Sequence, residues 1–229
     1  MEVLFDDVSI NAKFNISLAE RPVISAAERE YESIRVPGRD GSLTRELGYK
    51  SKLIPLRFNY IHKNNVEKTF RDITNWLTNK KKIAFSNDLS VYRLISQINI
   101  QDAKNDIKEH VDFIVEVETE PFWYENAGTQ TLSSGSTTIV NPSVIETGVI
   151  IKVYGTGTCR VTVNDNPMIF TDVQDFVVVD GRRGLAHRNG VSQDNKMSGH
   201  YPIFKSGNNE IQISGATEKV EIEKRWSWR

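Results

Sequence analysis

The sequence has little of several features that mark common protein classes. Cys159 is its one cysteine, so the chain can form no internal disulfide and offers no CxxC pair for a structural metal. Charged residues interrupt every apolar run before it reaches the length of a membrane span. The first residues, MEVLFDDVSI, are acidic where a signal peptide begins basic. We therefore expect a protein made in the cytoplasm of its cell of origin, with no membrane insertion.

An excess of charge of one sign is also missing. The formal net charge is −1, and neither side of residue 130 is polybasic, which argues against a strong electrostatic grip on nucleic acid. Hydrophobic residues make up 38% of the chain and charged residues 26%, proportions typical of a folded globular protein.

Catalytic and metal-binding motifs are absent from the sequence as well. It contains no phosphate-binding loop, no nucleophile elbow and no HExxH helix, and its four histidines lie far apart. Cys159 lies in GTGTCRVTV, a strand-like stretch in which a buried thiol is expected instead of a nucleophile. We expect no enzymatic activity, no catalytic residue, no metal and no cofactor.

The stretch EYESIRVPGRDGSL, residues 30–43, predicts a β-hairpin. Apolar and polar residues alternate up to Pro37, which removes a backbone donor. Asp40-Gly41 is a pair favoured in two-residue hairpin turns. The interpretation is a hairpin with a charged tip that could be a solvated turn or a contact surface. The residues of this tip are Pro37, Gly38, Arg39, Asp40 and Gly41.

Residues 64–79 carry the one convincing helical pattern, capped by Asn64 or Asn65. Its apolar residues recur at three- and four-residue spacing and form one stripe: Val66, Phe70, Ile73, Trp76 and Leu77. Strands are expected at 52–61, where Pro55 indicates an edge or a bulge, and at 82–85, 91–100 and 107–118. The last of these has an acidic face containing Glu116 and Glu118, either simply solvated or bordering an aqueous channel.

The composition changes at about residue 130, where a stretch rich in Gly, Ser and Thr begins. From residue 144 onward the pattern predicts only short strands at close spacing, typical of an antiparallel β-sandwich. The expected fold is mainly β (α+β). It has two domains, a β-rich domain with one helix at 1–130 and a β-sandwich at 131–229.

Aromatic residues of the second domain leave a carbohydrate-binding module open as an alternative function. Tyr201, Trp226 and Trp228, with nearby Arg and Asn donors, could form a platform for a bacterial cell-wall polysaccharide. The competing interpretation is that these aromatics close the end of the sandwich, and the position of both tryptophans at the end of the sequence favours it.

Three stretches together resemble the distal tail protein (Dit) family of long-tailed bacteriophages. The first is VPGRDGSL at 36–43 with the helix that follows it, and the second is GHYPIFKSGNNEIQISG at 199–215. The third is the closing run VEIEKRWSWR. Their order along the chain, with the boundary near residue 130 between them, also agrees with the family.

The resemblance implies a structural virion protein at the tail tip, assembled in the host cytoplasm. It implies a homohexameric ring formed by the first domain and a galectin-like sandwich as the second. The ring would join the tail tube protein to the tail-tip hub or lysin protein, pass DNA through its lumen without binding it specifically, and hold receptor-binding or baseplate proteins for host adsorption. On this basis we expect residues 37–41 at a subunit interface and Glu116 and Glu118 facing the lumen.

Overall fold

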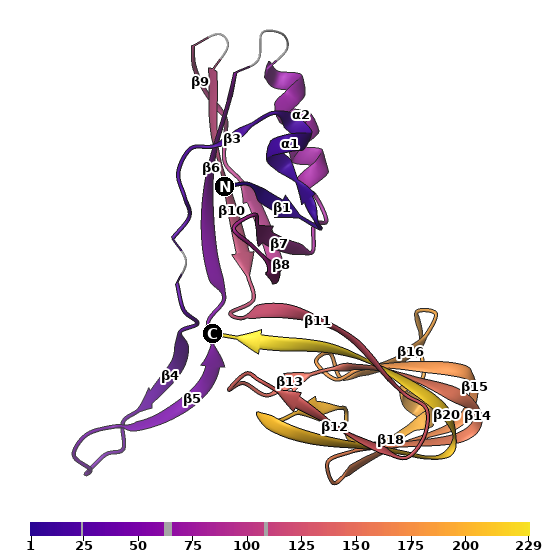
Figure 1. The fold of residues 1–229 in the computed structure, drawn as a ribbon. Coiled ribbons are helices and arrows are strands. Elements are labelled where there is room, and N and C mark those ends of the chain that lie inside the picture. The colour runs from indigo at the N-terminus through magenta and orange to yellow at the C-terminus, as the bar shows by residue number, and fades with distance from the viewer. Residues whose placement is uncertain (24, 62–65, 108–109) are drawn as a thin grey trace. The chain divides into compact units, whose positions relative to one another are not determined.

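The computed structural model describes residues 1–23, 25–61, 66–107 and 110–229, which form two compact units (Figure 1). The first unit is Met1–Trp123 together with Arg229, and the second is Tyr124–Trp228. The chain is mainly β, as predicted. The contacts within the chain place the boundary between the two units at Trp123 and Tyr124. Residue 130, the boundary expected from the composition, lies inside strand β11 (Trp123–Leu132).

The first unit is built on an antiparallel sheet with β10 (His110–Thr119) at its centre. β10 pairs along its whole length with β6 (Lys52–Ile61), and on its other side with β8 (Asp88–Ile100). β6 matches the predicted strand, whereas Ile107, which we expected in the same strand as Val111, belongs to β9. The remaining strands of this unit, apart from one hairpin, are short: β1 (Val3–Phe5), β2 (Val8–Ser9), β3 (Ser17–Leu18), β7 (Lys82–Phe85) and β9 (Lys104–Ile107).

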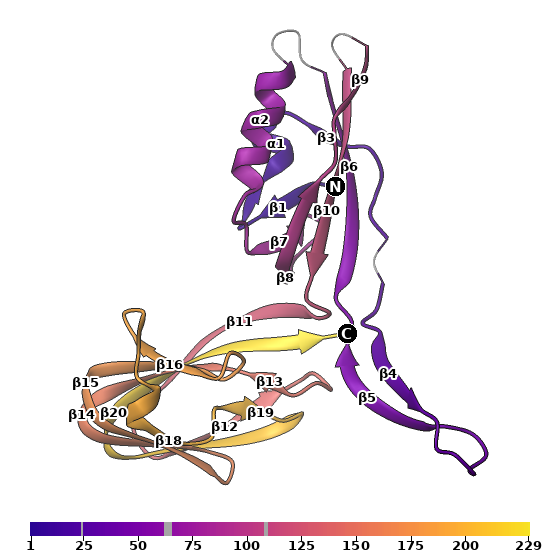
Figure 2. The same ribbon diagram turned by 180° about the vertical axis from the view of Figure 1, so that it is seen from behind.

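Helix α2 (Val66–Leu77) packs on one face of this sheet (Figures 1 and 2). Its apolar stripe is confirmed, since Ile73 and Leu77 are fully buried and Phe70 contacts Phe113 of β10 edge to face. The helix gives way to a turn in which Asn79 has a positive φ of 69°, a conformation that asparagine tolerates well. The predicted cap residues, Asn64 and Asn65, lie outside the described residues.

A second helix, α1 (Ile10–Phe14), corrects the expectation of a single helix. The Ser9 hydroxyl accepts a hydrogen bond from the Ala12 amide, and Asn15 ends the helix in the left-handed conformation. Five residues are too few to produce a readable helical period. The Phe14 ring contacts Trp76 of α2, so α1 helps to close the core over the sheet.

Strands β4 (Arg29–Ile34) and β5 (Leu43–Tyr49) form the predicted hairpin, but its turn differs from the prediction. Ile34 pairs with Leu43, so residues 35–42 form the connecting loop in place of a two-residue turn at Asp40-Gly41. The tight turn lies at Pro37-Gly38, where Gly38 has a φ of 80° and the Arg39 amide donates to the Val36 carbonyl. Proline followed by glycine is the sequence that a type II turn requires, and it replaces the turn that Asp40-Gly41 would have made.

The second unit is built on three long antiparallel strands, β14 (Ile150–Val163), β15 (Asn166–Asp180) and β20 (Gly207–Trp228). Each was expected as two short strands. At one end the three strands are flanked by β16 (Leu185–Arg188) and β17 (Val191–Ser192), and at the other by β18 (Met197–Gly199) and β12 (Ser136–Asn141). The same strands therefore contribute to both layers of a small sandwich. Its remaining short elements are β13 (Thr147–Gly148), β19 (Ile203–Phe204) and the 3-10 turn η1 (Asp194–Lys196).

The stretch 199–215, which carried part of the family resemblance, has a structural explanation. A Cβ on Gly199 would lie 1.9 Å from the Pro167 carbonyl oxygen, so only glycine fits there. The Asn209 side chain is fully buried, accepts from the Lys205 amide at 2.8 Å, and donates to the carbonyls of Lys205 and Gly207. The motif thus shapes a loop of the sandwich.

Candidate assembly interface

The sheet face opposite α2 carries acidic and amide side chains in the central strands β10 and β8. Glu116 of β10 accepts hydrogen bonds from Asn99 at 2.9 Å and from Gln101 at 2.7 Å. Glu118 shares this face because it lies two residues further along the strand, and the intervening Val117 is fully buried on the helix side. Fixed carboxylates repel a polyanion. Leu53 of β6, opposite Glu118, is an exposed apolar residue on the same face.

Strand β6 has an open edge in the first unit. β10 occupies one side of β6, while on the other side β3 pairs only with Asn59 and Phe58, and the Ala19 amide donates to the Arg57 carbonyl. From Lys52 to Leu56 this second side pairs with no strand among the described residues. Pro55 lies in this stretch, so the predicted edge position is confirmed. Open edges of this kind are common sites of pairing between chains.

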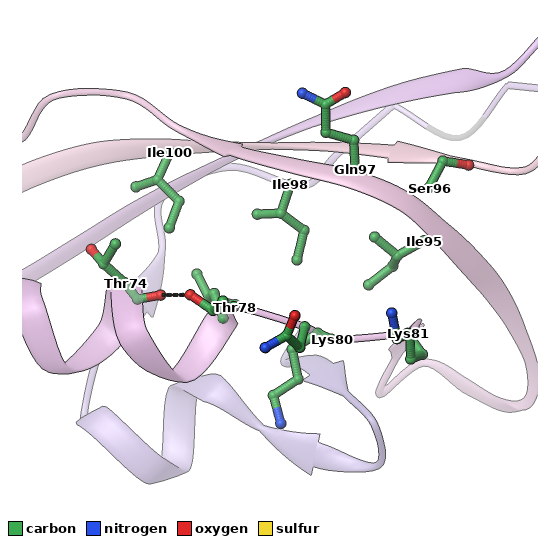
Figure 3. A pocket seen from close by; sticks show the side chains of 11 residues that line it. Thr74, Thr78, Lys80, Lys81, Ile95, Ser96, Gln97, Ile98 and Ile100 are labelled. Carbon is green, nitrogen blue, oxygen red and sulfur yellow. Dashed lines mark hydrogen bonds between the residues drawn. The ribbon is translucent and has the colours of Figure 1, made fainter.

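A groove lies between the end of α2 and strand β8 (Figure 3). Its volume is about 450 Å³. Ile95, Ile98 and Ile100 point into it from β8, while Gln97 points away from it. The opposite wall is polar and basic, and consists of Thr74, Thr78, Asn79, Lys80 and Lys81. The Lys80 side chain points away from the groove and pairs with Asp6 at 3.6 Å. The groove therefore combines an apolar floor with a polar rim.

The β4–β5 hairpin carries apolar side chains that the chain itself does not cover. Ile34 and Leu43 are paired on one face and are 40% and 42% exposed, and Leu47, at the bulge opposite Glu30 and Tyr31, is 52% exposed. The same face holds the Glu32–Arg45 ion pair at 3.9 Å. A lone two-stranded hairpin is at best marginally stable in water, so its exposed apolar face calls for a partner.

The tip of this hairpin is charged and solvent-exposed. Among the described residues, neither Arg39 nor Asp40 forms an ion pair, which leaves both available for intermolecular contacts. The structure thus places the predicted tip residues 37–41 together in one exposed loop.

Buried Arg93 secures the segment that leads into the hairpin, a role that the sequence did not reveal. The side chain is 2% exposed and donates to the carbonyls of Pro121 at 3.0 Å and Ser25 at 3.2 Å. It also lies over the Trp123 ring at 4.3 Å. The local sequence, VYRLIS, has the alternation of any half-buried strand, so nothing in it marks the arginine as a tether.

The aromatic residues proposed for carbohydrate binding are used within the second unit. Trp226 is 5% exposed and packs near Phe204, and the Trp228 indole donates to Glu125 at 2.9 Å. Tyr201 donates to Asp194 at 3.0 Å, and burial raises the pKa of this tyrosine. The pKa of Asp194 is lowered, first because it accepts from the Ala186 amide. No hydrogen bond or ring contact among the described residues joins Tyr201 to either tryptophan.

The acidic, histidine and cysteine side chains of the described residues form no metal-binding cluster. No set of three of these side chains is placed to hold a metal ion. Cys159 is fully buried, and that burial raises the pKa of its thiol and disfavours the nucleophilic thiolate. None of the helices in the described ranges is long and apolar enough to cross a bilayer.

Comparison with solved structures identifies the architecture, although no protein-family model and no curated protein matches the sequence. The SPP1 Dit protein, described as a paradigm of the hub adsorption apparatus in phages that infect Gram-positive bacteria, superposes with a TM-score of 0.67. The match covers 100% of this chain and 99% of that one at 12% identity. The chain has the Dit fold.

A second match to the Dit fold comes from a chain of the phage P2 baseplate in its activated, calcium-containing conformation. It has a TM-score of 0.55 and 11% identity, and covers 93% of this chain and 90% of that chain. At such identities the likeness establishes the fold. The exposed hairpin, open edge and polar sheet face are features of this chain's own residues on that fold.

Proposed function

We propose that this chain is a structural protein of a phage tail tip that assembles as a closed homohexameric ring. The observation that carries the proposal is the full-length match to the SPP1 Dit fold. The ring would join the tail tube protein to the hub protein at the virion tip. Receptor-binding or baseplate proteins for host adsorption would attach to it.

Features of the first unit support ring formation. The open edge of β6, the groove beside β8 and the uncovered apolar face of the hairpin are separate surfaces on one unit. Different surfaces that complement each other between copies generate head-to-tail contacts, which close into a ring when the rotation permits. In this assembly residues 37–41 contact a neighbouring subunit or the adjoining tail ring.

The polar sheet face supports a lumen through which DNA passes without binding. Glu116 and Glu118 are proposed to border this lumen, where their charge repels the phosphate backbone. Arg57 lies opposite Ile114 in the same sheet, so the face is acidic with an isolated base. A lumen lined mainly by basic residues would contradict the assignment.

Electron microscopy of the purified protein tests the proposal directly. Class averages are expected to show sixfold rings with a central channel. Particles without rotational symmetry, at concentrations well above those needed for imaging, would contradict it.

A further inference from the structure

Two aromatic rings lie side by side on the outward face of the second unit. Tyr154 of β14 pairs in register with Phe176 of β15, and their ring centroids are 6.1 Å apart. The neighbouring residues Val153 and Val177 point into the core, so both rings are on the solvent side of the sheet. Both rings are half-buried.

Three cations converge on these rings. Lys152 lies 4.2 Å from the centre of the Phe176 ring and 4.6 Å from that of Tyr154, and Arg188 lies 5.7 Å from Phe176. Lys219 lies 4.2 Å from the Tyr154 ring and is paired with Glu221 at 2.9 Å. Cations are held over ring faces by the ring quadrupole.

Of these cations only Arg188 lacks an anionic partner in the described part of the chain. The pKa of Glu221 is lowered first by its hydrogen bond from Lys219, and also by the charge of Lys152, which lies opposite it in the β14–β20 ladder. Lys219 is matched by Glu221, whose hydrogen bond raises the pKa of the lysine. Lys152 and Arg188 have no carboxylate within 4.0 Å in the described part of the chain. Arg188 makes only a long hydrogen bond of 3.5 Å to the side-chain oxygen of Gln174. Its guanidinium is therefore available to bind an anion.

A cavity of about 120 Å³ opens beside Phe176 and Arg188. The amide side chains of Gln174 and Gln193 and the hydroxyl of Thr171 line it. It lies next to a bulge in β15, where the register against β14 skips between Phe170 and Val173. The Asp172–Lys196 ion pair, at 2.9 Å, also lines it. The cavity thus places hydrogen-bonding groups next to Arg188.

We propose that this cluster binds a phosphate-bearing saccharide. Arg188 and Lys152 would hold the phosphate, since a guanidinium donates two parallel hydrogen bonds to phosphate oxygens. The amide and hydroxyl groups of the cavity would bind sugar hydroxyls. An acidic peptide is the competing occupant, because between its pairings with β18 and β16 the stretch 171–177 of β15 pairs with no strand on the side away from β14 among the described residues. The site does not depend on ring assembly.

Titration calorimetry on the full-length protein at low salt tests the site. Glucose 1-phosphate is expected to bind at least tenfold more tightly than glucose or inorganic phosphate. Lys152→Gln with Arg188→Gln should weaken that binding at least tenfold, and raising the salt should weaken it further. Lys205→Gln, at an exposed lysine of the same unit, is the matched control and should change nothing.

Four results would overturn the proposal. These are no saturable binding of glucose 1-phosphate, unchanged binding by the double variant, inorganic phosphate binding as tightly as the sugar phosphate, and a glutamate-rich peptide binding as tightly. The last would indicate a protein-facing patch. Arg188→Lys tests whether a loss of binding results from misfolding. It keeps the positive charge and the aliphatic part of the side chain but removes the planar guanidinium that donates two parallel hydrogen bonds. We expect this variant to weaken binding while its thermal unfolding stays unchanged.

Discussion

Ile34 and Leu43 face each other at the end of the β4–β5 ladder, and their side chains remain 40% and 42% exposed. Apolar residues paired across two strands would normally be covered by a third element. In the proposed ring that cover is a second copy of the chain.

Charged residues in place of Ile34 and Leu43 should therefore weaken the assembly without lowering the stability of the folded subunit. We expect Ile34→Glu with Leu43→Lys to weaken association by roughly 100-fold, since losing two buried apolar contacts costs about 3 kcal/mol. Thermal unfolding of the separated subunit should change little because both side chains are exposed in it. Ser33→Glu with Thr44→Lys introduces the same charges on the opposite hairpin face and serves as the control. Equal loss of assembly in both variants would argue against a specific apolar contact.

The charged tip gives a second test. Arg39→Glu with Asp40→Lys exchanges the two charges at constant net charge, and we expect association to weaken about tenfold because complementary charges set the register between partners. Analytical ultracentrifugation measures the change. Exchanging Lys68 and Asp72, an ion pair on the exposed side of α2, is the control and should leave assembly intact. If the tip exchange also leaves it intact, the tip is a solvated turn.

Reversal of the lumen charges should create DNA binding. Glu116→Lys with Glu118→Lys is expected to raise affinity for duplex DNA at least tenfold at low salt, with a steep loss as salt increases. The neutral variant Glu116→Gln with Glu118→Gln separates charge from the lost hydrogen bonds to Asn99 and Gln101. Glu210→Lys with Glu218→Lys, at exposed sites in the second unit, is the control. An equal gain in DNA affinity in that control would contradict the proposal that Glu116 borders the lumen.

Two adjacent asparagines offer a matched stability test of the sandwich motif. Asn209 is fully buried with hydrogen bonds to Lys205 and Gly207, whereas Asn208 is exposed. Asn209→Ala should lower the free energy of unfolding by about 3 kcal/mol, because buried backbone groups lose their partners. Asn208→Ala should change it by less than about 0.5 kcal/mol. Urea denaturation measures both, and similar values for the two would contradict the structural role of the motif.

Local patterns predicted much of the first unit. The period of two around Val111 and Val117 and the stripe from Phe70 to Leu77 are set by which face is buried, so they are readable from the sequence. The hairpin turn was misplaced because two turn-forming pairs, Pro37-Gly38 and Asp40-Gly41, lie within five residues, and only the three-dimensional ladder decides between them.

Tertiary contacts decided what the sequence left ambiguous. Gly155 and Gly157 look like a break between strands, yet they lie in a bulge inside continuous β14, where a Cβ on Gly155 would approach the Ala216 carbonyl oxygen to 2.2 Å. Two further features join residues that are distant in the sequence: the groove between α2 and β8, and the hydrogen bonds of Arg93. Because no local sequence pattern spans such distances, neither feature could be predicted. The sequence favoured a packing role for Trp226 but left a binding surface open, and its burial agrees with packing.

The mass of the assembled protein in solution tests the central claim most directly. Size-exclusion chromatography with light scattering, at several concentrations and at low salt, is expected to give six times the 26.1 kDa mass of the chain. The Ile34→Glu, Leu43→Lys variant should elute at the mass of a single folded chain. A wild-type protein that remains a strict monomer at every concentration would contradict the proposed ring.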